Sequence, residues 1–146
     1  MTDGTIKTPW HLWVVGVIAV LFNAIGVFDF VMTMAKGAAY LASAGLTPAQ
    51  VAHYAHMPAW VTVDWAVGVF GAFIGSALIL LRNKLAWQVL AVSLAAYLLN
   101  LLYTYVLSDG GKLMGPQMGV MSVVIAGQLV VFMAYGWWMA RRGVLR

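Results

Sequence analysis

Four long apolar runs, at about residues 12–35, 60–81, 85–108 and 118–140, constrain this chain more than any other feature. Each run has about 22 to 24 residues, enough for a helix to cross the ~30 Å hydrocarbon core of a bilayer. Hydrophobic residues make up 64% of the chain and charged residues only 8%, which excludes an ordinary water-soluble domain. The sequence therefore predicts an all-α fold, a four-helix transmembrane bundle that forms a single domain over residues 1–146.

The distribution of lysine and arginine predicts the orientation of the bundle. Six of these residues lie in the two terminal tails and the loop between the second and third runs (Lys7, Arg82, Lys84, Arg141, Arg142 and Arg146), and the other two are Lys36 and Lys112. Because positive side chains collect on the cytoplasmic side, we expect both termini in the cytoplasm and the loop 36–59 outside. The basic residues form no patch, so nucleic acid is not an expected partner.

The first apolar run is expected to remain as a membrane span. It is longer than the apolar region of about 7 to 15 residues in a signal peptide, and it contains Asn23 and Asp29.

In the outward loop, Thr47 is a helix N-cap, Pro48 suits the first helical position and Pro58 is a stop, which predicts a short surface helix of about ten residues. The connection "SDGGKLMGPQ", rich in glycine, predicts turns.

Two aspartates lie inside the predicted spans, where an ionisable side chain indicates a functional site. At 1.5 Å per residue, Asp29 and Asp64 both lie roughly 10 Å outward of the midplane, so they share a layer. Two desolvated carboxyls in one layer cannot both ionise cheaply, so we expect them to share a proton. Lys36, extending along its own helix toward Asp29, is the competing explanation.

Further polar residues face the same layer or the space below it. At 100° per residue each predicted helix carries one polar stripe, as an inward-facing bundle requires. We predict an outer-half pocket for a proton or a small ligand, formed by Asn23, Asp29, Asp64, Asn100, Tyr103 and Gln128.

A stripe of glycines accompanies Asp64 along the second predicted helix. Gly68, Gly71 and Gly75 follow Asp64 at i+4, i+7 and i+11, and "GAFIG" is a GxxxG motif, which lets another backbone approach closely. The aspartate therefore points at protein and not at lipid. It is either a functional acid or only a hydrogen-bonding group, with the glycines packing the first helix or a second subunit.

Two histidines in the outward loop raise the question of a metal. His53 and His56 lie at i and i+3 of the predicted surface helix, and methionines cluster nearby. Imidazole with thioether suits copper, and imidazole with carboxylate suits zinc or iron. Surface histidines and space-filling methionines give the same pattern. The chain has no cysteine, which excludes disulfides and thiolate metal sites, and the sequence leaves any cofactor unknown.

Several segments resemble a known group of proteins. In "TPWHLWVVGVIAVLFNAIGVFDFVMT", "MPAW", "GSALILLR" and "GVLR" the chain resembles uncharacterised small four-span bacterial inner-membrane proteins, often labelled hypothetical or sugar transporter. The resemblance implies a four-span topology and a bacterial inner (plasma) membrane location, and no function.

The sequence is compatible with three functions. The first is a non-enzymatic membrane protein that self-associates or serves a larger membrane complex, with its pocket binding a proton or small ligand. The second is a small proton-coupled transporter acting as a homo-oligomer, with Asp64 or Asp29 as the coupling carboxyl. The third is a metal-dependent membrane enzyme that uses both aspartates with His53 and His56.

Overall fold

The computed structural model describes residues 6–146, and within that range all regular secondary structure is helical. Four helices are long and apolar enough to cross a membrane: α1 (Trp10–Lys36), α4 (Ala59–Leu80), α5 (Ala86–Leu102) with its π-helical continuation η1 (Tyr103–Leu107), and α7 (Pro116–Arg141). These bounds agree closely with the predicted runs, so the four-helix transmembrane fold is confirmed. Residues 1–5 of the predicted domain lie outside the described residues.

Three short helices lie in the loops that connect the spans: α2 (Ala38–Ser43), α3 (Pro48–Ala55) and α6 (Gly110–Met114). At the start of α3 the Thr47 hydroxyl accepts a hydrogen bond from the Gln50 backbone N–H, and the Gln50 side chain accepts one from the Thr47 N–H. This capping box satisfies two N–H groups that a helix start leaves free. The connection that was predicted to be rich in turns contains the short helix α6.

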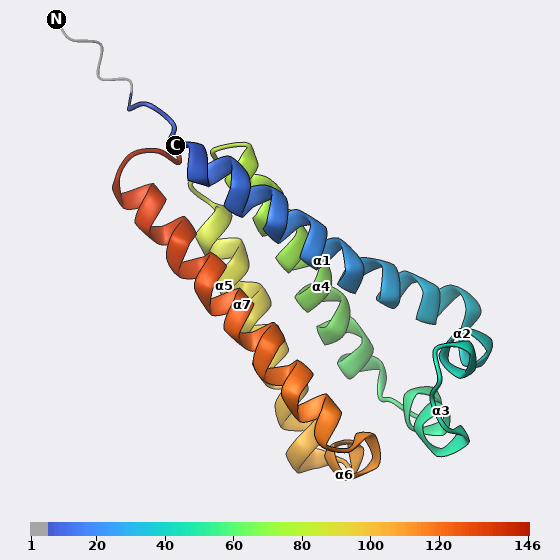
Figure 1. Ribbon diagram of the computed structural model, residues 1–146. Coiled ribbons are helices and arrows are strands. Elements are labelled where there is room, and N and C mark those ends of the chain that lie inside the picture. Colours follow the sequence, from blue (N-terminus) through green and yellow to red (C-terminus); the bar gives the residue numbers. More distant parts are fainter. Residues whose placement is uncertain (1–5) are drawn as a thin grey trace, which may run out of the picture.

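The four spans pack in sequence order, α1 against α4, α4 against α5, and α5 against α7. The helices α1 and α7 are therefore the two ends of a row. Figure 1 shows them close together near the chain termini and diverging toward the end that carries α2, α3 and α6. The bundle is consequently closed at one end and open at the other.

The closed end contains the apolar core. Leu12 at the start of α1, Ile79 at the end of α4 and Leu90 near the start of α5 are fully buried there. The last residues of the chain fold onto this core. The Arg146 N–H donates to the Arg82 carbonyl (2.7 Å), and the Arg146 carbonyl accepts from the Lys84 N–H (3.2 Å). The C-terminal segment thus joins the α4–α5 loop.

The start of α1 and the end of α7 lie at this same end of the bundle (Figure 1). An even number of spans requires this arrangement, so the start of α1 and the end of α7 lie on one side of the membrane. That this side is the cytoplasm stays a prediction from the positive charges.

Candidate functional site

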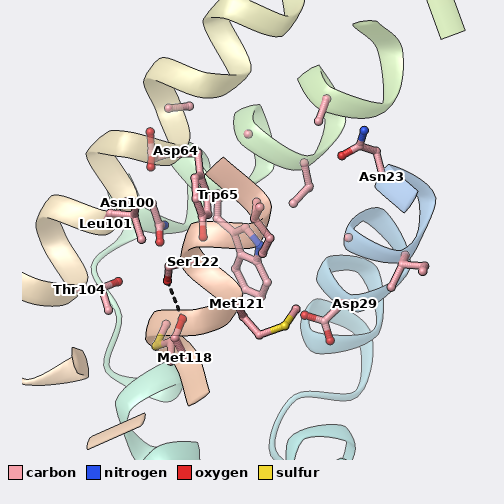
Figure 2. Close-up of a pocket in the computed structure, with 18 of the residues that line it drawn as sticks. Asn23, Asp29, Asp64, Trp65, Asn100, Leu101, Thr104, Met118, Met121 and Ser122 are labelled. Atoms are coloured by element: carbon pink, nitrogen blue, oxygen red, sulfur yellow. Dashed lines mark hydrogen bonds between the residues drawn. The ribbon is translucent and has the colours of Figure 1, made fainter. Parts of the chain in front are cut away.

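A pocket of about 650 Å³ occupies the open half of the bundle, and all four spans together with α3 contribute to it. Its walls are mostly apolar. Of the predicted site residues, it is lined by Asn23, Asp29, Asp64, Asn100 and Gln128. Figure 2 shows Asp64 and Asn100 on one side and Asn23 and Asp29 on the other, with Trp65 and Met121 between them. Because α1 and α7 diverge here, Phe28 and Met121, which line the pocket, are also about half exposed to the surroundings of the bundle.

The floor of the pocket is a polar network that joins α1, α4 and α7. The Asn23 amide donates to the Ser76 hydroxyl (3.0 Å), while the Gln128 amide donates to the Asn23 carbonyl oxygen (3.3 Å). Ser76 in turn donates to the Ala72 backbone carbonyl at 2.7 Å. Asn23 and Ser76 are buried, and their hydrogen bonds satisfy polar groups that would be costly to leave unpaired in a bilayer. The network closes the pocket toward the core.

Asp64 enters the pocket from α4, about one turn after this helix begins at Ala59. Its Oδ2 atom is buried and has no hydrogen-bond partner among the described residues. The side chain of Asn100 on α5 is a polar neighbour of the carboxyl group. A buried acceptor without a donor is uncommon in folded proteins and calls for an explanation, such as a ligand or a water.

Asp29 differs from Asp64, because another side chain donates a hydrogen bond to its carboxyl group. The Tyr40 hydroxyl of α2 donates to its Oδ1 atom at 2.8 Å. This hydrogen bond, with a smaller effect of burial, raises the pKa of Tyr40 above its ordinary value. The hydrogen-bond partner of Asp29 is thus Tyr40 and not Lys36. No hydrogen bond joins Asp29 to Asp64 within residues 6–146, and the shared proton stays a prediction.

The helix α3 covers the pocket at its outer end, and its two histidines lie in different surroundings. His53 and Tyr54 line the pocket, whereas His56 is exposed and its Nδ1 atom bonds to the Ala52 carbonyl at 2.8 Å. Burial raises the pKa of Tyr54, and the charge of Asp29 adds to this effect. In the described part of the chain no three His, Asp or Glu side chains are grouped as metal ligands would be.

Tyr103 is the predicted pocket residue that does not line the cavity. Its ring packs against Trp60 (ring centroids 5.6 Å apart) and against His53 (6.3 Å). These two rings cover Tyr103 at the edge of the polar stripe, whereas the next residue, Thr104, does line the cavity.

The glycine stripe of α4 has two different surroundings. A Cβ atom at Gly71 would lie 3.2 Å from Ser93 Cβ, and one at Gly75 would lie 2.7 Å from Leu90 Cγ, so both glycines face α5. Gly68 lines the pocket, and a Cβ there would meet no atom within 4 Å. The neighbour of Gly71 and Gly75 is thus α5, and not α1 or a second copy.

The polar residues of the site that the sequence reasoning missed include Tyr40, Ser76 and Ser122. Ser76 and Ser122 are single hydroxyls inside apolar spans, and that position is a signal that could have identified them. Tyr40 carries no such signal, since it belongs to a loop helix and reaches Asp29 only because the chain turns back after Gly37, where φ is +54°.

Comparison of the chain with protein-family models, with curated proteins and with solved structures finds no match. The pocket is therefore the feature that indicates a function.

Proposed function

We propose that this integral membrane protein is a non-enzymatic binding protein that holds a small ligand in the pocket between α1 and α7. The observation that supports the proposal is the Oδ2 atom of Asp64, which has no hydrogen-bond partner among residues 6–146 and lies in a cavity of about 650 Å³. Binding sites for small molecules have this size, with mostly apolar walls and a few convergent polar groups. A ligand that donates a hydrogen bond would satisfy Asp64, and the polar floor at Asn23 and Gln128 would limit its depth.

The divergence of α1 and α7 supports a ligand that reaches the pocket from the bilayer. Side chains such as Phe28 and Met121 line the cavity and are exposed at the same time. In a membrane such exposure is exposure to lipid. An apolar molecule could therefore enter laterally between the two helices, in the half of the bundle that the positive charges assign to the outer leaflet.

A pair of glycine substitutions tests the proposal. Gly68→Leu fills the pocket, because nothing lies within 4 Å of the added Cβ, while Gly127→Leu adds the same side chain to an exposed site on α7. Wild type and both variants are purified in detergent and examined by native mass spectrometry and by analysis of their organic extracts. We expect a small molecule bound to wild type and Gly127→Leu and absent from Gly68→Leu. Equal retention in all three, or in none, would refute the proposal.

The proposal also includes a bacterial inner membrane, following the resemblance, and self-association or membership of a larger membrane complex. The mass of the protein in detergent, measured by light scattering, tests self-association directly. A monomer that co-purifies with no other chain from native membranes would contradict this part of the proposal and leave the pocket unaffected.

A proton-coupled transporter is the second candidate, and Asp64 is the observation that favours it. Ionisable side chains inside membranes mark proton and substrate pathways. The transport hypothesis requires the polar floor to open, since Asn23, Ser76 and Gln128 now separate the pocket from the closed end. Proton-coupled flux in liposomes, lost on Asp64→Asn with binding retained, would distinguish transport from binding alone.

A further inference from the structure

The charges around the pocket are all of one kind. The carboxyls of Asp29 and Asp64 line it, whereas none of the chain's eight lysines and arginines belongs to its lining. His53 is the lining side chain that could become positive, but its Nε2 atom is directed at α6, where a Cβ on Gly110 would lie 3.0 Å from it. Even if the two carboxyls share one proton, the pocket carries a negative charge in a medium that screens charge poorly.

The two carboxyls differ in what they can offer a ligand. Oδ1 of Asp29 already accepts from Tyr40, and the Asp29 side chain is exposed. Oδ2 of Asp64 is buried and has no donor among residues 6–146. Asp64 is thus the carboxyl that a ligand would complement.

Aromatic rings lie beside this carboxyl and across the cavity. Trp65, Tyr54 and Tyr97 line the pocket, and the Trp65 ring is held edge-to-face by Phe30 with ring centroids 4.9 Å apart. The face of an aromatic ring attracts cations, more strongly when water is excluded. Rings and a carboxyl together form the usual environment for an organic cation, and the remaining apolar wall suits an apolar body.

We propose that the pocket binds an organic cation with an apolar body, with its positive charge against Asp64 and its body between α1 and α7. This inference rests on the proposed function, since it names the chemical class of the ligand for the same site. A single cationic group suits this arrangement, because Asp64 offers a buried oxygen without a donor among residues 6–146, whereas Asp29 is exposed.

Two probes of nearly equal size and opposite charge test the inference. Tetraphenylphosphonium is a permanent cation with four apolar rings, and tetraphenylborate is the matching anion. Equilibrium dialysis measures the binding of each radiolabelled probe to the purified protein, with the uptake by protein-free micelles subtracted. Each variant is compared with wild type for the same probe, which removes any difference in micelle partition.

We expect saturable binding of tetraphenylphosphonium to wild type and no saturable binding of tetraphenylborate. Asp64→Asn should weaken tetraphenylphosphonium binding by about tenfold or more, because a neutral amide loses the ionic attraction. Asp64→Glu keeps the charge and should retain binding. Asp109→Asn, the matched control at an exposed carboxyl outside the pocket lining, should change affinity by less than about threefold. Gly68→Leu should abolish saturable binding. Thermal melts identify any variant that fails to fold.

The outcomes separate this inference from the proposed function. If a small molecule co-purifies in a Gly68-dependent way but tetraphenylphosphonium does not bind, or binds Asp64→Asn as well as wild type, the ligand is neutral or anionic and the inference is wrong. Equal affinity for both probes would refute it as well. If neither probe nor any endogenous compound depends on Gly68, both the inference and the proposed function fail.

Discussion

Alanine substitutions of three glycines in α4 would test the packing of the bundle. The sequence places Gly68, Gly71 and Gly75 on one stripe with no difference between them. In the structure a Cβ at Gly68 meets nothing within 4 Å, one at Gly71 lies 3.2 Å from Ser93 Cβ, and one at Gly75 lies 2.7 Å from Leu90 Cγ and 3.2 Å from the Leu90 backbone nitrogen. Gly75 is therefore the position at which even a methyl group forces α4 and α5 apart.

The expected magnitudes follow from two opposing effects. Replacing glycine with alanine inside a helix stabilises it by about 0.8 to 1.0 kcal/mol. Overpacking costs about 1 to 3 kcal/mol where neighbours cannot move, as at Gly75, whose contacts include backbone. Gly68→Ala should thus raise the free energy of unfolding by up to about 1 kcal/mol. Gly75→Ala should lie about 1 to 3 kcal/mol below Gly68→Ala, with Gly71→Ala between them.

Equilibrium unfolding in mixed micelles with increasing sodium dodecyl sulfate, followed by circular dichroism, measures these free energies. Gly127→Ala is the control for helix propensity, because Gly127 also has open space at its Cβ position and faces outward from α7. The packing argument would be refuted if Gly75→Ala were as stable as Gly68→Ala. A lower oligomer mass for Gly68→Ala would contradict the assignment of that glycine to the pocket.

Three further predictions concern other parts of the molecule. Alkaline phosphatase fused after Arg146 should be inactive, because the positive charges place the C-terminus in the cytoplasm, and an active fusion would reverse the orientation. In a double-mutant cycle Asn23→Ala and Gln128→Ala should couple by about 0.6 kcal/mol and at most about 1.7, whereas strictly additive costs would exclude their hydrogen bond. Burial raises the folded-state pKa of Tyr54 above its ordinary 10.0, so its contribution to stability is fully present below pH 10 and is lost as pH rises through the folded pKa. Tyr54→Phe should therefore weaken the loss of thermal stability above pH 10, and an unchanged pH dependence would contradict this.

The sequence predicts the spans well because the bilayer imposes a length and a polarity on each of them. The start of α3 was also predictable, since Thr47 and Pro48 act on the helix that directly follows them. Both cases depend on local sequence or on the solvent, and neither requires knowledge of distant contacts.

Contacts between helices were much less predictable. Helical periodicity places Gly71 and Gly75 on one face but does not identify α5 as the neighbour, because the backbone of any helix can pack closely against a face made of glycines. Tyr103 was predicted in the pocket, whereas its ring packs against Trp60 and His53, and helical periodicity does not reveal such contacts between elements. The Tyr40 hydroxyl reaches Asp29 through the path of a loop, which no pattern of hydrophobicity encodes.

The packing of the C-terminal segment was likewise not predictable from the sequence, and it leads to a last prediction. By composition "ARRGVLR" is a charged cytoplasmic tail, yet Val144 and Leu145 are only 2% and 3% exposed and belong to the core. The chain turns back at Gly143, where φ is +75°, so that Leu145 reaches the closed end of the bundle. Leu145→Ala should then cost about 2 to 5 kcal/mol, as for other buried leucines. Leu81→Ala, at a side chain that is 74% exposed, removes the same atoms from the same end of the molecule and should cost far less. Unfolding in mixed micelles compares the two variants, and equal costs would mean that the tail does not pack on the core.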